Sequence, residues 1–291
     1  MATCCAWRRL ASPESLFRQF QEGHQEAPYG KTWLKQLFAG QMGFSLMAII
    51  IGLTIGIPLG SSSSDWDVAS NKGYRRVCHD LQVEDPFLTA ITQPCGPWGN
   101  WSRFNISKGG KSALTVLELR EAGRPILRRV SKIITGRIKA KSYVFVEQPL
   151  SSQLLMKDEL AEVVDWIRQG ALTVIRVDGC QVGYQDQESG LPHYKPSVYI
   201  TSLLTAETVF KDCICEHKHQ PLEGNNRFDS RTSVWPYKLN HSVIQAMLQQ
   251  GSAESTSAQG VVDAFLAEVR PGEGQPPTTS WRCLHSGVTG C

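Results

Sequence analysis

Apolar and polar positions alternate in blocks between residues 31 and 250, and three of the apolar blocks have the composition of buried strands. They are DPFLTAI (85–91), SYVFVEQP (142–149) and LTVIRVDGCQVG (172–183). β-Branched and aromatic residues are frequent in these runs, which is typical of strands that are covered on both faces. We therefore expect three strands of one sheet here.

Two longer stretches between these runs have a helical period. Residues 111–140 carry apolar side chains at helical spacing, but Pro125 within them predicts a break or a kink. Residues 157–170 end at Gly170, as helices commonly end at glycine. Strands that alternate with helices predict an α/β fold, a Rossmann-like and mostly parallel sheet with helices on both faces. Ligands of such domains bind at the carboxyl ends of the strands.

The apolar stretch LFAGQMGFSLMAIIIGLTIGIPLG, residues 37–60, fits two structures that exclude each other. Residues 36–64 contain no charged side chain and are long enough to cross a bilayer as one helix. That structure would make the chain a single-pass membrane protein whose remaining domain binds a partner or nucleic acid without catalysis. The glycines and Pro58 of the stretch equally mark a strand end, a tight loop and a buried helix over residues 44–56.

The composition narrows the class of protein. Of 291 residues, 41% are hydrophobic and 20% charged, which excludes a wholly disordered chain and a membrane protein with many spans. The nine cysteines are odd in number and irregularly spaced, and residues 1–15 lack the apolar core of a secretory signal. Reduced thiols and a nuclear or cytoplasmic location are therefore expected. We expect a loosely ordered lead-in (1–30), one domain (31–250) and a flexible tail with one short helix (251–291).

Six short motifs follow one another along residues 36–248. They read LFAGQMGFSL, QPCGPWGNWSRFN, VEQP, VDGCQVG, CICEHKHQPLEG and VWPYKLNHSVIQAML. The first three resemble motifs of the DNA cytosine-5 methyltransferases: a strand that runs into a Phe-x-Gly-x-Gly loop, a Pro-Cys loop and a Glu-Asn-Val strand. The whole set is most similar to the diverged methyltransferase-like segment of retrotransposon polyproteins from dinoflagellates and similar protists.

This resemblance implies a methyltransferase-type sheet and S-adenosylmethionine-dependent methyl transfer to cytosine in DNA, by a retrotransposon-derived relative with diverged motifs. Transfer to C5 of cytosine needs a nucleophile at C6, and Cys95, just beyond a strand end, offers a thiolate for that role. Glu147, at the end of the next apolar run, is the candidate acid that contacts the base and stabilises developing charge. A nucleic-acid-binding module that keeps the fold without the chemistry is a further alternative.

The resemblance also implies a cofactor site around the first motif. The residues expected to line S-adenosylmethionine, with the one expected to hold its ribose given last, are Phe38, Gly40, Gly43 and Asp67. Gln36 stands where the family has an acidic residue. Because the later motifs follow in order, we favour the folded loop and helix over the membrane span for residues 37–60.

Contacts with DNA are expected from two places in the chain. A target base must leave the duplex to reach such a site, and Trp98 and Trp101 are expected to stack on it or to fill the gap that it leaves. Residues 224–233 lie where the related enzymes carry their target-recognition segment. The residues of this segment expected to face DNA are Asn225, Asn226, Arg227 and Arg231.

One stretch has the composition of a metal site. The alternating residues that offer ligands are Cys213, Cys215, His217 and His219. In a straight strand all four would point to one side but spread over about 20 Å, so one zinc ion could bind two neighbours at most unless the chain turns. Cys180 could supply another ligand. The same residues also fit a polar surface strand or loop with incidental thiols.

Overall fold

The computed structural model gives the positions of most residues of the predicted domain. The residues that it describes are 27, 32–39, 42–60, 67–185, 191–211, 213–215, 219 and 235–254. Everything said below concerns these residues.

A five-stranded mixed sheet forms the centre of the structure. In spatial order its strands are β1 (Thr32–Leu37), β2 (Pro86–Ile91), β3 (Tyr143–Pro149), β5 (Pro196–Thr201) and β4 (Thr173–Asp178). β1, β2 and β3 pair in parallel, and β5 pairs antiparallel with both β3 and β4. Four of the five strands therefore run in one direction, with a single reversed strand between β3 and β4.

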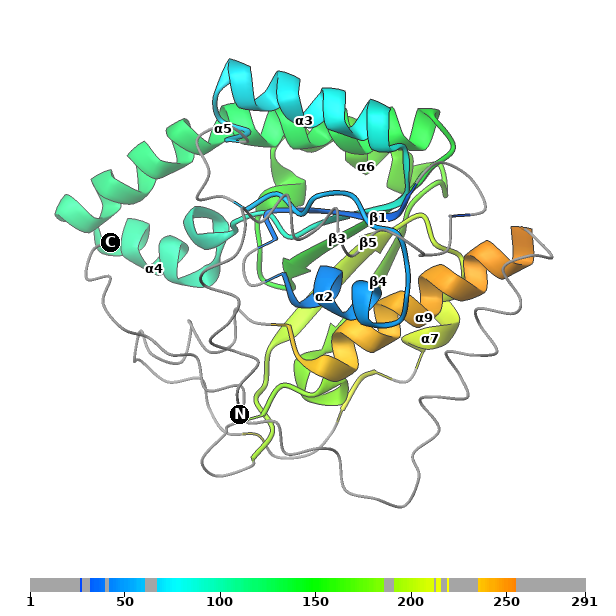
Figure 1. Cartoon of the computed structure of the whole chain (residues 1–291). Coiled ribbons are helices and arrows are strands. Elements are labelled where there is room, and N and C mark those ends of the chain that lie inside the picture. Colours follow the sequence, from blue (N-terminus) through cyan, green and yellow to red (C-terminus); the bar gives the residue numbers. More distant parts are fainter. Residues whose placement is uncertain are drawn as a thin grey trace, which may run out of the picture.

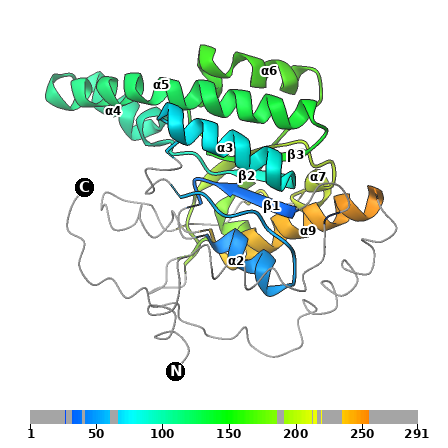
Figure 2. The same ribbon diagram turned by 45° about the horizontal axis from the view of Figure 1, so that its top comes forward.

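Helices cover both faces of this sheet (Figures 1 and 2). On one face lie α3 (Asn71–Glu84), α5 (Gly110–Lys139) and α6 (Ala161–Arg168). On the other face lie α2 (Gly43–Ile50), α7 (Thr205–Val209) and α9 (Tyr237–Glu254). The short helix α4 (Asn100–Lys108) packs beside the first part of α5. The predicted α/β fold, a Rossmann-like and mostly parallel sheet with helices on both faces, is confirmed.

Two apolar cores result, one on each face of the sheet. Within β3, Val144 and Val146 point into the core beneath α3 and α5, whereas Phe145 between them points into the core beneath α2 and α9. Because neighbouring side chains of a strand point to opposite faces, a strand buried on both sides needs an unbroken apolar run. This requirement explains the runs that the sequence shows.

The stretch 37–60 contains three separate pieces rather than one helix. β1 ends at Leu37, and α2 begins at Gly43. Gly52, with φ 80°, turns the chain after α2, so the helix is shorter than the predicted 44–56. The chain then returns along β1 through the parallel bridges Leu34 to Ile55 and Leu37 to Leu59. Among the residues that the structure describes, no helix has the length and apolar character needed to cross a membrane.

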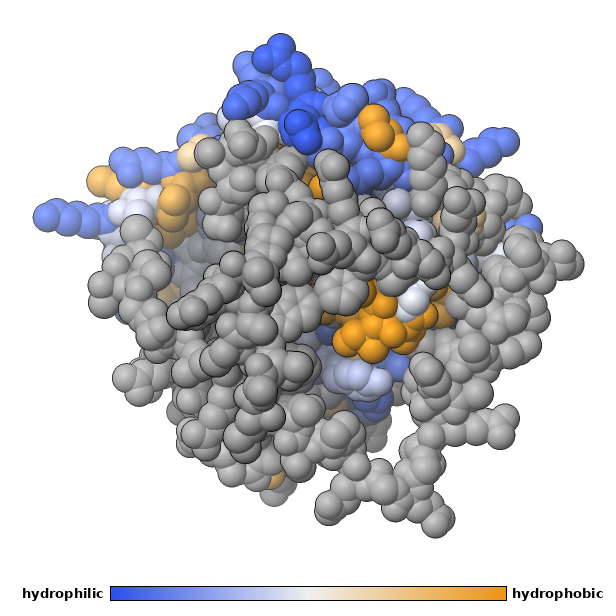
Figure 3. Space-filling model, in the orientation of Figure 1, coloured by the Kyte–Doolittle hydropathy of each residue, from blue (hydrophilic) through white to orange (hydrophobic). Residues whose placement is uncertain are grey.

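α2 is apolar on its outer side as well as on its inner side. Phe44 and Met47 are buried against the sheet, whereas Leu46 and Ile50 are exposed. Figure 3 shows an apolar patch in the region of α2 and a hydrophilic surface over α3. This lack of a polar side explains why the stretch also resembles a membrane span in the sequence.

Two other features differ from the sequence prediction, and a third agrees with it. α5 is one helix that includes Pro125, so the predicted break is absent. The strand expected over residues 172–183 ends at Asp178, and a short 3-10 turn, η6 (Gly179–Val182), follows it. Gly170, with φ 76°, ends the α6 region as predicted.

Candidate functional site

The register of the three parallel strands brings the predicted site residues to one edge of the sheet. Leu37 of β1 lies opposite Ile91 of β2, and Ile91 lies opposite Val146 of β3. The residues that follow each of these, in order across the sheet, are Phe38, Thr92 and Glu147. Since neighbouring strands lie about 4.8 Å apart, the backbone positions of this row span about 10 Å.

The chain leaves β1 and β2 in opposite directions across the sheet. After β1 the chain forms α2 on one face and then lies along the outer side of β1. After β2 it forms α5 on the opposite face and continues to β3 on the inner side. The helices that follow β1 and β2 therefore lie on opposite faces of the sheet, which makes this edge the expected ligand-binding crevice of an open α/β sheet.

The loop that leaves β1 is held in a strained conformation. Phe38 and Met42 both have positive φ, 58° and 57°, although neither is glycine. Left-handed backbone at such residues costs about 1 kcal/mol each. It persists only where the surroundings enforce it, often at ligand clamps. Gly40 lies outside the described residues.

Gln36 holds the first turn of α2. Met42, the residue before this helix, provides no side-chain cap. Instead the buried Gln36 side chain reaches from β1, and its Oε1 accepts from the Ser45 amide at 3.2 Å and from the Ser45 hydroxyl at 2.8 Å. One of the amides that a helix leaves unpaired at its start is thereby satisfied.

The start of α9 packs against the start of α2. A Cβ atom added to Gly43 would lie 3.1 Å from Nδ2 of Asn240, so the Asn240 side chain lies close to the Gly43 backbone. Asn240 Nδ2 in turn donates to the carbonyl oxygen of Trp235 at 3.2 Å, and the Trp235 ring lies 6.1 Å from that of Phe44. Residues 235–240 thus form one wall beside the predicted cofactor loop.

The loop after β2 is tied to the loop after β1 and carries Cys95. The Thr92 hydroxyl donates to the carbonyl oxygen of Phe38 at 2.7 Å. Cys95 precedes the 3-10 turn η3 (Gly96–Trp98), and its carbonyl oxygen accepts from the Trp98 amide at 2.9 Å. Its half-buried side chain packs against the core beneath α3 and α5.

Glu147 lies inside β3, two residues before the strand ends at Pro149, rather than at the strand end as predicted. Its carboxylate accepts from the hydroxyl of Ser197 at 3.1 Å and lies 3.9 Å from Nζ of Lys195. It is paired across the strands with Tyr199, so it belongs to the face that α2 and α9 cover. Cys95 and Glu147 therefore approach the carboxyl edge from opposite faces of the sheet.

The two tryptophans occupy different environments. Trp98 is buried, and the charged groups of Arg120 and Lys157 lie 5.2 and 5.4 Å from the centre of its ring. This burial leaves no free face of the ring for a base. Trp101 is 63% exposed and packs edge-on against Phe104 at 6.0 Å.

Asp67 lies in the turn that leads into α3. Its Oδ1 accepts from the Ala69 amide at 2.9 Å, and its carbonyl oxygen accepts from both the amide and the hydroxyl of Ser70. Its predicted role on a ribose is not tested by these contacts. Four residues expected to face DNA lie outside the described part of the chain: Asn225, Asn226, Arg227 and Arg231.

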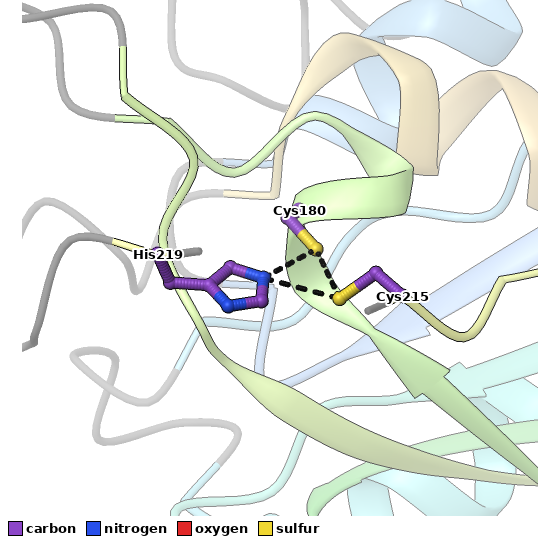
Figure 4. A group of neighbouring side chains, drawn as sticks. All are labelled: Cys180, Cys215 and His219. Carbon is purple, nitrogen blue, oxygen red and sulfur yellow. Dashed lines mark hydrogen bonds between the residues drawn. The ribbon is translucent and has the colours of Figure 1, made fainter. Parts of the chain in front are cut away.

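The structure also brings together three possible metal ligands, Cys180, Cys215 and His219 (Figure 4). The two sulfur atoms are 3.1 Å apart, and Nε2 of His219 lies 3.1 Å from Sγ of Cys215 and 3.2 Å from Sγ of Cys180. Partial burial, the Cys180 thiol and the Asp178 carboxylate raise the pKa of Cys215 to about 12. Cys213 is not in this group, because its side chain packs against the core beneath α2 and α9. His217 lies outside the described residues.

Several residues that shape these sites carry no signal in the sequence. Thr92, Lys195 and Asp178 act through partners that are distant along the chain. The exception is Thr92, whose place directly between a strand and the Pro-Cys turn is a signal that the sequence does carry. Lys195 and Asp178 become recognisable only when the pairing of β3, β5 and β4 is known.

No protein-family model matches the sequence, and no curated protein matches it either. A comparison with solved structures finds the crystal structure of S. pombe Dnmt2 methyltransferase, with a TM-score of 0.36 and 10% sequence identity. The match covers 66% of this chain and 57% of that chain, so it spans less than two thirds of the solved structure.

Proposed function

We propose that this chain is an S-adenosylmethionine-dependent methyltransferase that acts on cytosine in DNA. The observation that carries the proposal is the row formed by Phe38, Thr92 and Glu147 at the edge where the chain leaves β1 and β2 toward opposite faces of the sheet. Three motifs that resemble those of the cytosine-5 methyltransferases are far apart in the sequence. Their meeting at one ligand-binding edge supports a common site.

The residues around the first loop fit a cofactor with an amino-acid end. The N-terminal turn of α2 carries the positive end of the helix dipole, which favours a carboxylate. Gly43, at that turn, lets Asn240 approach the backbone, so a wall is already formed beside it. The strained residues Phe38 and Met42 fix the path of the loop. S-Adenosylmethionine, when bound there, would supply the electrophilic methyl group.

Cys95 would act as the nucleophile. Its thiolate adds to C6 of the flipped cytosine, and the electron pair of the C5–C6 double bond then becomes available at C5. Glu147 would contact N3 and the exocyclic amine and stabilise the charge that the addition produces. To do so, its carboxylate must exchange the hydrogen bond from Ser197 for one to the base.

The experiment that tests this proposal is a methyl-transfer assay with labelled S-adenosylmethionine and cytosine-containing DNA. We expect transfer by the full chain and its loss, by a factor of at least about 1,000, in Cys95→Ser. Cys78→Ser is the matched control, since Cys78 is a half-buried thiol on α3 away from the edge. Transfer that survives in Cys95→Ser would contradict the assigned nucleophile.

A nucleic-acid-binding module without catalysis is the second candidate. The observation that favours it is the placement of Cys95 and Glu147 on opposite faces of the sheet. In that case DNA would bind equally well to the chain and to Cys95→Ser, and neither would transfer a methyl group.

A further inference from the structure

Two segments that are distant in the sequence bring three metal-binding atoms together at the carboxyl end of β4. Cys180 lies in η6, directly after β4, and Cys215 and His219 belong to a segment 35 and 39 residues later. Their side chains point toward one another from different parts of the chain (Figure 4). The chain therefore does turn here, as a shared ion would require.

The triangle that these atoms form is slightly smaller than that of a tetrahedral zinc site. Its sides measure 3.1, 3.1 and 3.2 Å. Zinc binds thiolate sulfur at about 2.3 Å and imidazole nitrogen at about 2.0–2.1 Å. At these bond lengths and tetrahedral angles the ligand atoms lie about 3.5–3.8 Å apart, so the three side chains must separate by about 0.5 Å to admit the ion. No large movement of the backbone is needed to reach this arrangement.

Asp178 holds Cys215 in position within the cluster. Its buried carboxylate accepts from the Cys215 amide at 3.1 Å through Oδ2, which also lies 3.6 Å from the Cys215 sulfur. Its own amide donates to the carbonyl oxygen of Cys213 at 2.7 Å. Hydrogen-bonded carboxylates of this kind hold metal ligands in position, and the negative charge favours a cation.

We propose that Cys180, Cys215 and His219 bind one zinc ion, which fastens Cys215 and His219 to the turn after β4. Two thiolates and one imidazole are a ligand set that selects zinc over magnesium or calcium. The described residues supply three of the four ligands of a tetrahedral site. This inference goes beyond the proposed methyl transfer and does not depend on it.

The ion would also position residues next to the candidate active site. The ring of His219 packs against that of Tyr194 at 4.9 Å, and the following residue, Lys195, reaches Glu147. The Lys195 carbonyl oxygen accepts from the Gly179 amide at 3.0 Å. A Cβ atom on Gly179 would lie 2.8 Å from that oxygen, so only glycine allows this approach. The metal site and Lys195 therefore form one continuous unit.

A disulfide between Cys180 and Cys215 is the competing use of the same atoms. The two thiols are free in the structure, at a sulfur–sulfur distance of 3.1 Å. This distance exceeds the bond length of about 2.05 Å, but a small rotation could close it. The test must therefore separate a metal site from an oxidised pair.

The first measurement is the metal content of the full chain, purified under reducing conditions without chelator. We expect about one zinc per chain, and less than about a tenth of that in Cys180→Ser, Cys215→Ser and His219→Ala. Cys213→Ser is the matched control, because Cys213 lies in the same segment but outside the cluster, and it should keep its zinc.

The second measurement does not depend on the folding of any variant. Cobalt(II) added to the reduced, metal-free chain should give the intense visible bands of tetrahedral coordination and a sulfur-to-cobalt band in the near ultraviolet. Absence of both zinc and these bands would overturn the proposal. Zinc retained at full content in both cysteine variants would also overturn it, as would a Cys180–Cys215 disulfide found after rapid alkylation.

Discussion

The hydroxyl of Thr92 donates to the carbonyl oxygen of Phe38 at 2.7 Å, and so joins the loops that follow β1 and β2. The Thr92 amide adds a second bond, to the carbonyl oxygen of Leu37 at 3.2 Å. Beyond these strands the chain continues to α2 on one face of the sheet and to α5 on the other, so Thr92 links the two loops where their paths separate. The proposed cofactor and nucleophile loops depend on that relation.

The first prediction concerns this link. Thr92→Val removes the hydroxyl donor and should lower the free energy of unfolding by about 1 kcal/mol, measured by urea denaturation. Affinity for S-adenosylmethionine should fall with it, because the Phe38 loop loses its anchor. Thr89→Val is the matched control in the same strand: the buried Thr89 hydroxyl has no hydrogen-bond partner in the described part of the chain. That change should be neutral or stabilising, and equal losses in both variants would contradict the role of Thr92.

The second prediction concerns the buried ion pair between β1 and α3. Nζ of Lys35 lies 2.6 Å from Oε2 of Glu84, and the Lys35 side chain is fully buried. Burial lowers the pKa of Lys35 and raises that of Glu84, and the attraction between the two only partly offsets this. Lys35→Met alone should cost about 3 kcal/mol or more, because it leaves a buried carboxyl group without its partner.

The double variant Lys35→Met/Glu84→Leu provides the control for this pair. Since two apolar side chains need no charge partner, it should recover much of the stability lost in the single variant. Gly56→Ala gives an independent check of the pair. A Cβ atom there would lie 2.0 Å from Oε2 of Glu84, so this change should also destabilise the chain. Strictly additive effects of the two single changes, measured by denaturation, would contradict the coupling.

The third prediction concerns the cap of α2. Gln36→Leu removes the acceptor used by the Ser45 amide and hydroxyl and should destabilise the protein by about 1–2 kcal/mol. Gln36→Glu keeps an acceptor oxygen and serves as the conservative control. It should therefore stay closer to the parent chain in thermal denaturation. A Leu variant as stable as the parent chain would contradict the role of these hydrogen bonds.

The fourth prediction is a pH dependence carried by Glu159. Burial of this carboxyl group would raise its pKa, but the hydrogen bond from Arg124 at 2.7 Å, a backbone hydrogen bond and the charges of Arg124 and Arg128 together outweigh burial, and the pKa is lowered below 4.5. A pKa lowered in the folded state adds stability above about pH 4.5 that is lost as the pH falls through the folded-state value. The Tm difference between the parent chain and Glu159→Gln should therefore be constant near neutrality and shrink below pH 4.5.

Glu162→Gln is the control for the pH series. Glu162 is exposed and lies 3.4 Å from Nζ of the exposed Lys139, a surface pair that should contribute little at any pH. A difference for Glu159→Gln that grows as the pH falls would contradict the sign of the assigned pKa change.

Much of the sheet could be predicted from the sequence because both faces are buried. Strands such as β2 and β3 then require continuous apolar runs, and Gly170 ends a helix in its usual way. The break expected at Pro125 is absent because α5 is long and one face of it packs against the sheet. This packing outweighs the local cost of a proline. Stretch 37–60 was ambiguous because α2 has apolar side chains on all sides.

The candidate sites were predictable only in part, because they depend on pairings between distant residues. The sequence indicated Cys215 and His219 together with Cys180, but no local pattern excluded Cys213 from the cluster. Glu147 lies on one face of the sheet because of its register in β3. Cys95, in the loop after β2, packs against the core on the other face. No single motif encodes either position. Trp98 is of a residue type that often stacks on bases, but in this fold its side chain is buried.

The proposed cofactor site can be tested by titration calorimetry of the purified full chain with S-adenosylmethionine. We expect saturable binding that is lost in Gly43→Asp, where a carboxylate would meet Asn240 at the start of α2. Binding should persist in Gly136→Asp, because Gly136 lies on α5 with open space around its Cβ position. A folded chain that binds no S-adenosylmethionine, or that binds it equally well in Gly43→Asp, would contradict the proposed cofactor site.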